Sequence, residues 1–105
     1  ADFNNALNQK EQVRNRIRKE IVSYLAALQG SATIVNRFES AVIRHITKAK
    51  ESVEFAYAQG AGGLIDLLDA ERNYKAMMLD YFMAERDQAL AYADLLMAVG
   101  EEPRE

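Results

Sequence analysis

Residues 58–63 read Ala-Gln-Gly-Ala-Gly-Gly and form the one strong interruption in a chain that is otherwise compatible with helix. Glycine adopts positive φ values that side chains disfavour, so three glycines in six positions permit a tight reversal. The other two glycines are isolated, and the single proline lies near the end of the 105-residue sequence. A β-sandwich of this length needs turn signals about every 8–12 residues, and they are absent. The sequence therefore predicts two long helices joined by one turn.

Upstream of the turn, apolar residues recur with the 3-4 spacing that is typical of coiled-coil packing. One stripe is Leu7, Arg14, Ile21, Leu28, Val35, Val42, Ala49 and Ala56, and its partner is Phe3, Lys10, Ile17, Tyr24, Ser31, Phe38, His45 and Ser52. A further apolar set lies beside them: Val13, Leu25, Ile34, Ile43, Ile46 and Val53. The predicted helix is thus apolar over a broad arc and should contact more than one neighbour.

Gly30 and Ser31 lie inside this run without changing its heptad phase, so we expect a kink or a close helix contact there and no full break. Downstream of the turn, helical spacing continues through Leu64, Leu67, Leu68, Tyr74, Met78, Tyr81, Gln88, Tyr92, Leu95 and Val99. Gly100 is interpreted as a C-cap and Pro103 as a stop. The predicted bounds are a helix over 2–58, a turn over 59–63, a helix over 64–99 and a frayed tail over 100–105.

The predicted fold is all-α, a long antiparallel coiled-coil hairpin with arms of about 80 Å and about 54 Å. A turn near residue 61 leaves residues 1–21 without a partner, and their apolar side chains exposed. Those side chains are Phe3, Leu7, Val13, Ile17 and Ile21. A hairpin is one layer deep and encloses no core, so its apolar arc must be buried against other chains or against missing parts of a longer protein.

Charge differs between the two halves of the chain. Residues 1–50 carry nine Lys and Arg against four Asp and Glu, and residues 51–105 carry four against twelve. Arms packed side by side would therefore attract each other, although charged residues that simply keep the exposed helix faces solvated explain most of this pattern. The chain has no cysteine, and it starts without Met or the basic and apolar regions of a signal peptide. We therefore expect a processed or excised piece.

The segment from Tyr57 through Gly60 to Ile65-Asp-Leu-Leu-Asp-Ala70 resembles the second periplasmic turn of the TolC-like outer membrane efflux proteins. Their pattern there is an aromatic residue, two residues, a glycine, and then Leu/Ile-Asp-hydrophobic-Leu-Asp-Ala. Further matches are Arg72-Asn-Tyr74, Tyr81, Tyr92, Leu95 and Ala98-Val-Gly100. The resemblance covers residues 40–100 and is closest in wording to the heavy-metal branch, the CzcC- and CusC-like proteins.

This resemblance implies a trimer whose outer-membrane β-barrel continues as an α-helical barrel in the periplasm of a Gram-negative cell. Each protomer supplies two helical hairpins to the tunnel. The hairpin turns close like an iris and dock on a periplasmic adaptor, which links the channel to an inner-membrane pump. The chain corresponds to one such hairpin of a drug or heavy-metal efflux pump, and the transported substrate stays open.

The resemblance also assigns roles to residues near the turn. Asp66 and Asp69 match aspartates that line the narrow entrance in some members, where threefold repetition gives a ring that attracts cations. The alternative is that both favour the helix dipole from the first turn of the return helix. Tyr57 matches an aromatic residue that helps to hold the closed state, or it is a hydrophobic staple beside the turn.

The tip itself is implied to pack into grooves of the adaptor. It consists of Gly60, Ala61, Gly62, Gly63 and Leu64. Some members carry an arginine two residues after the first glycine, where this chain has Gly62, so a basic latch at that position is absent.

Other chemistry is weakly indicated. His45 is interpreted as a packing residue, because its neighbours four residues away are alanines and offer no metal ligands. The methionines at 77, 78, 83 and 97 are interpreted as core or interface residues. The basic cluster at residues 14–19 lacks the interleaved aromatics of a nucleic-acid site and is interpreted as a solvated or ion-paired face. We expect no enzyme, cofactor or metal site. The alternative function is a stand-alone helical interaction module that oligomerises through its apolar face.

Overall fold

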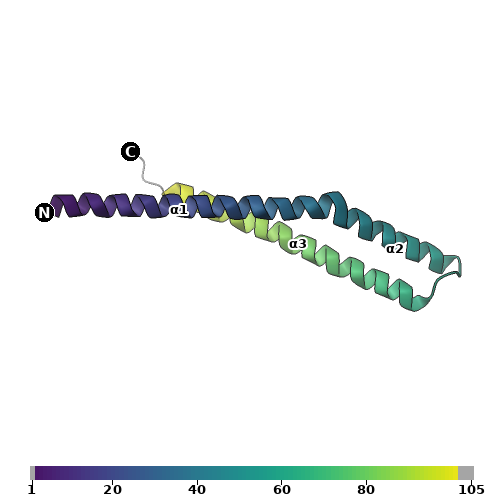
Figure 1. Ribbon diagram of the computed structural model, residues 1–105. Coiled ribbons are helices and arrows are strands. Elements are labelled where there is room, and N and C mark those ends of the chain that lie inside the picture. Colours follow the sequence, from purple (N-terminus) through teal and green to yellow (C-terminus); the bar gives the residue numbers. More distant parts are fainter. Residues whose placement is uncertain (1, 102–105) are drawn as a thin grey trace.

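The computed structural model describes residues 2–101 and folds them into a single helical hairpin (Figure 1). The first arm consists of α1 (Asp2–Arg37), a π-helical turn (Phe38–Val42) and α2 (Ile43–Ala58). The second arm is α3 (Leu64–Glu101). The two arms pack antiparallel in a particle of 85 × 20 × 14 Å. The predicted all-α hairpin with unequal arms is confirmed.

The first arm stays helical through Gly30 and Ser31, and its irregularity lies further along, at residues 38–42. There the backbone N–H of Ile43 donates to the carbonyl of Phe38, five residues back instead of four. A π-helical turn of this kind adds one residue to an α-helix. Because an α-helix has 3.6 residues per turn, one added residue rotates everything downstream by about 100°.

This rotation changes which side of α2 faces α3. Upstream of the π-helical turn, the side chains of the predicted stripes that lie between Arg14 and Phe38 are buried or half-buried, as the heptad pattern predicts. Downstream, Ile46, Lys50 and Val53 are half-buried, one position later than the stripe through His45, Ala49 and Ser52; Ile43, Thr47, Glu54 and Ala56 are half-buried as well. The prediction that His45, Ala49 and Ser52 are buried on the seam is wrong, because these three residues are exposed, although Ala49 and Ser52 border the space between α2 and α3. The seam has moved by one residue.

The most deeply buried residues lie away from the turn. They are Ile17 and Val35 in α1 and Ala84, Ala91 and Ala98 in α3. The three alanines follow one another at intervals of seven residues, and Ala98 is only 3% exposed. Because alanine projects little from the backbone, a heptad row of alanines lets two helices approach closely. We call this part, residues 14–37 with residues 81–101, the shaft, and α2 with residues 64–80 the tip section.

The far end of the hairpin differs from expectation in two ways. α3 runs through Gly100 to Glu101, so Gly100 is not a C-cap, and Pro103 lies outside the described residues. The paired length is also greater than predicted, since Glu20 and Glu101 line one small recess between the arms. Ile17 is accordingly 7% exposed and Ile21 is half-buried, whereas both were expected to be exposed.

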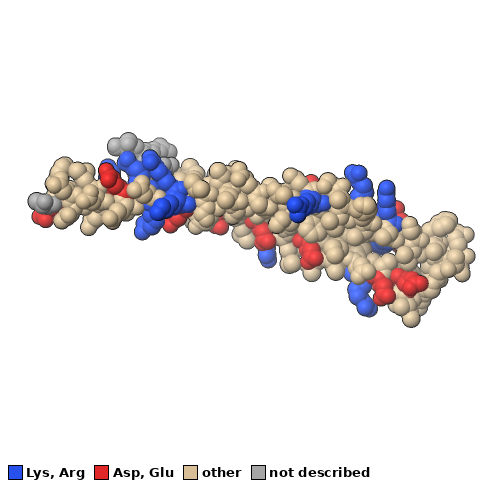
Figure 2. Space-filling view, in the orientation of Figure 1, with Lys and Arg blue, Asp and Glu red and all other residues tan. Residues whose placement is uncertain are grey.

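The remaining overhang of α1 bears its apolar side chains in solvent, as predicted for Phe3, Leu7 and Val13. Figure 2 shows Lys and Arg side chains gathered over the N-terminal half of α1, while the outermost end of the molecule at the turn is uncharged and Asp and Glu side chains lie just behind it. The arms of opposite net charge do lie side by side.

Candidate functional site

Backbone hydrogen bonds from the turn cap the end of α2. The N–H of Ala61 donates to the carbonyl of Ala56 at 2.8 Å, and the N–H of Gly60 donates to that of Tyr57 at 3.1 Å. Gly60 has a φ of 77°, in the left-handed region. This is the Schellman motif, in which a glycine just beyond the helix satisfies carbonyls that would otherwise be unpaired. The sequence therefore requires glycine at position 60 for a backbone reason.

The second glycine of the turn lies where space is tight. A Cβ atom at Gly62 would lie 3.3 Å from the Cβ of Ala56 and 3.4 Å from the backbone nitrogen of Tyr57. The N–H of Gly62 also donates to the Ala56 carbonyl at 3.1 Å. The turn is thus folded tightly against the last turn of α2, and the tip is small.

The surface of the tip is apolar and uncharged. Residues 55–65 contain no charged side chain. The exposed large apolar residues there are Phe55, Tyr57, Leu64 and Ile65. Tyr57 is 43% exposed, and its backbone carbonyl accepts the hydrogen bond from the Gly60 N–H that helps to close the turn. Such a concentration of exposed apolar groups is typical of a surface that contacts another molecule.

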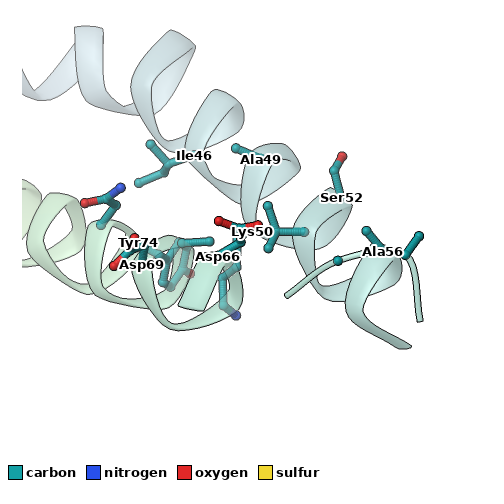
Figure 3. Close-up of a pocket in the computed structure, with 13 residues that line it drawn as sticks. Ile46, Ala49, Lys50, Ser52, Ala56, Asp66, Asp69 and Tyr74 are labelled. Atoms are coloured by element: carbon teal, nitrogen blue, oxygen red, sulfur yellow. The ribbon is translucent and has the colours of Figure 1, made fainter. Parts of the chain in front are cut away.

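A groove of about 660 Å³ runs between α2 and α3 directly behind the tip. Its walls come from Ile46, Ala49, Lys50, Ser52, Val53 and Ala56 of α2, from Ala61 and Gly62, and from Asp66, Asp69, Ala70, Asn73 and Tyr74 of α3. In Figure 3, Ile46 lies on the side of α2 that faces α3, whereas Ser52 points away from it. The tip section thus contains open space where the shaft is closely packed.

Lys50 bridges the two walls of this groove. Its ammonium nitrogen lies 4.7 Å from the centre of the Tyr74 ring, a cation–π contact across the hairpin. The same nitrogen is 3.7 Å from a carboxylate oxygen of Glu54, one turn along α2. Lys50 could not be singled out from the sequence, although it lies seven residues after Ile43 and so shares the heptad position of that apolar residue.

Asp66 and Asp69 line the same groove, so their spacing of three residues does place them on one helix face. Only Asp66 lies in the first turn of α3, which begins at Leu64. Interaction with the helix dipole falls off within the first turn and therefore accounts for Asp66 better than for Asp69. Within residues 2–101, no three side chains of Asp, Glu or His come together as ligands for a metal.

A second contact across the hairpin involves the first two residues of the π-helical turn. The hydroxyl of Tyr81 donates to a carboxylate oxygen of Glu39 at 2.8 Å, and the rings of Tyr81 and Phe38 pack with their centres 6.0 Å apart. The hydrogen bond to Glu39 raises the pKa of Tyr81 to about 12, assisted by desolvation and by the negative charges of Glu39 and Glu85. Neither Glu39 nor the π-helical turn was singled out from the sequence.

The face of α3 that points away from the first arm carries a second apolar stripe. Leu79, Met83, Leu90 and Met97 are exposed, and with Arg86 and Ala93 they follow a 4-3-4 spacing. Phe82, beside this stripe, is 56% exposed. We call this set of residues between 79 and 97 the outer stripe. An apolar stripe at heptad spacing is the pattern with which one helix packs on another.

No helix within residues 2–101 combines the length and the apolar character needed to cross a membrane. No family model, curated protein or solved structure matches the chain.

Proposed function

We propose that the chain is a periplasmic tunnel segment of a trimeric outer-membrane efflux channel, with its turn at the gated entrance and its tip in contact with a periplasmic adaptor. The adaptor would connect it to an inner-membrane pump. The proposal rests on the resemblance of residues 40–100 to TolC-like efflux proteins and on one structural observation, the outer stripe of α3.

The outer stripe supports a wall of helices because each helix in such a wall has two neighbours. α3 packs on the first arm through one face and presents an exposed heptad stripe on the opposite face. A helix in an isolated two-helix hairpin needs only one apolar face, and its other face is normally polar. In a closed cylinder, the second face is buried against a helix of the next hairpin.

The tip supports adaptor docking. It is narrow, uncharged from residue 55 to residue 65 and closed by backbone hydrogen bonds, so it presents a smooth apolar end. The groove behind it leaves room between the arms for side chains of a partner. Both features concern residues that the resemblance places at the docking end.

The two aspartates are proposed to act on cations at the entrance. In a trimer, Asp66 and Asp69 would contribute six carboxylates around one axis, which attract cations and repel anions. Replacing both with asparagine should weaken block by multivalent cations in single-channel recordings of the intact trimer. Asp80→Asn, an exposed aspartate further along α3, is the matched control and should leave the block unchanged. Unchanged block in the double variant would contradict this role.

Fractionation of the source cells tests the function as a whole. An antibody raised against the chain should detect its parent protein in the outer-membrane fraction, as a trimer after chemical cross-linking. Loss of the gene should sensitise cells to toxic compounds or metal salts that a pump would export. A parent protein confined to another compartment, with unchanged sensitivity, would contradict the channel. That result would favour a stand-alone helical module that oligomerises through the outer stripe.

A further inference from the structure

The π-helical turn divides the first arm into two parts with different registers. Up to Phe38, the residues that face α3 follow the heptad pattern of α1. Beyond Val42, three half-buried residues come one position later than that pattern requires, namely Ile46, Lys50 and Val53, while Ala56 near the turn stays half-buried at its original position. The cause is the single added residue, marked by the hydrogen bond from the Ile43 N–H to the Phe38 carbonyl.

The sequence of α2 is suited to both registers. Without the added residue, the seam would continue through His45, Ala49, Ser52 and Ala56, which keep the spacing of Val35 and Phe38. Three of these four side chains are small, so α2 would approach α3 more closely and the groove would narrow. With the added residue, larger side chains face α3, and they hold the arms apart.

The two registers favour different terms of the folding free energy. The observed register half-buries Ile46 and Val53 and forms the contact of Lys50 with Tyr74. The uninterrupted register would restore the ordinary i to i−4 hydrogen bonds at residues 38–42 but would expose those two apolar side chains. These contributions oppose each other, as is required of an element that has two packings.

One contact that contributes to the free-energy difference between the two registers lies at the π-helical turn itself. The Tyr81 hydroxyl donates to Glu39, the second residue of the π-helical turn, and the Tyr81 ring packs on Phe38, the first. In the uninterrupted register, Phe38 keeps its place because it lies upstream of most of the added turn. The hydrogen bond to Glu39 is therefore the contact best placed to distinguish the two states.

We propose that residues 38–42 are a register switch: α2 packs on α3 in either of two registers one residue apart, and the Tyr81–Glu39 hydrogen bond holds the register with the added residue. The switch rotates α2 by about 100° and changes the groove behind the tip from wide to narrow. It depends on the geometry of this hairpin and is independent of the proposed channel function.

Because the chain lacks cysteine, single cysteines report on the register without background labelling. Ser52→Cys and Val53→Cys are made separately, and the rate of alkylation by a small maleimide is measured for each. In the otherwise unchanged chain, Cys at 52 should react several-fold faster than Cys at 53, because Ser52 is exposed and Val53 is half-buried. The ratio of the two rates measures the register.

Two further changes move the ratio if the switch exists. Deleting Ser40 removes the added residue, and the ratio should invert. Tyr81→Phe keeps the ring and removes the hydroxyl, and the ratio should fall toward one. Tyr92→Phe, at an exposed tyrosine of the same helix, is the control and should leave the ratio unchanged.

Each alternative result overturns the proposal. If the chain without Ser40 keeps residue 53 protected, or loses its helical circular dichroism, then the second register is not a stable packing. If Tyr81→Phe leaves the ratio unchanged, the hydrogen bond does not hold the register. An inverted ratio in the deletion together with a shifted ratio in Tyr81→Phe is the result that the proposal requires.

Discussion

The shaft and the tip section are built from the same two helices and pack in opposite ways. Within residues 2–101, all five buried residues lie in the shaft, and three of them are alanines of α3. The tip section contains no buried residue and instead encloses a groove of about 660 Å³. Three alanines of α3 are buried in the shaft, whereas the larger side chains of Lys50 and Tyr74 meet across the groove in the tip section. We expect side-chain size at the seam to account for this difference.

Enlarging one seam residue in each region should expose this difference most strongly. Ala91→Leu adds three carbons to a closed interface, and we expect it to destabilise the hairpin by about 2 kcal/mol through overpacking. Ala70→Leu adds the same atoms beside the groove, where there is room, and should change stability by less than about 0.5 kcal/mol. Denaturation followed by circular dichroism at one fixed chain concentration measures both.

Ala89→Leu is the surface control for this comparison, because Ala89 is exposed between the two faces of α3. Its effect on folding stability should be as small as that of Ala70→Leu. Equal losses for Ala91→Leu and Ala70→Leu would mean that the two regions are packed alike, contrary to the structure.

The glycines give a second comparison, with effects of opposite sign. Gly60→Ala forces a side chain into a left-handed conformation and should destabilise the hairpin by about 1–2 kcal/mol. Gly30→Ala lies inside α1, with nothing within 4 Å of the added Cβ, and should stabilise it by about 1 kcal/mol. Thermal midpoints of the two variants should thus move in opposite directions. A stabilising Gly60→Ala would contradict the Schellman turn.

A smaller effect is expected at the boundary between the regions, from the ionisation of Tyr81. Because folding raises the pKa of Tyr81 from 10.0 to about 12, the folded state holds this proton more tightly than the unfolded chain does. The associated stability is fully present below pH 10 and is lost as the pH rises toward 12. The stability of the unchanged chain should therefore fall more steeply between these values than that of Tyr81→Phe. Parallel curves would contradict the contact with Glu39.

The packing of the shaft could be predicted from the sequence better than the packing of the tip section. The turn, both arms and the seam up to Phe38 follow from glycine placement and heptad spacing. The shift of the seam beyond residue 42 could not be predicted, because the sequence offers two stripes there, one through His45 and Ser52 and one through Ile46 and Val53. The choice between them depends on burial against α3 and on contacts such as Tyr81 with Glu39, which lie 42 residues apart.

The buried alanines were also missed, for a different reason. Ala84, Ala91 and Ala98 recur at seven-residue spacing in the sequence, but larger neighbours such as Tyr92 and Val99 carry a stronger hydrophobic signal. Those neighbours are exposed in the hairpin. For the candidate site, the shared face of Asp66 and Asp69 could be predicted from spacing alone, whereas the groove depends on how far apart the helices stand.

The outer stripe of α3, which lies in the shaft except for Leu79, is exposed, and the central claim is that another helix covers it. Sedimentation equilibrium of the chain at micromolar concentrations tests this most directly. The exposed stripe predicts self-association of the chain, and the double change Met83→Glu with Leu90→Glu should abolish it while the helical signal stays intact. The matched pair Tyr92→Glu with Leu96→Glu, which adds the same charge beside the stripe, should still associate. A stable monomer of the unchanged chain would contradict the claim.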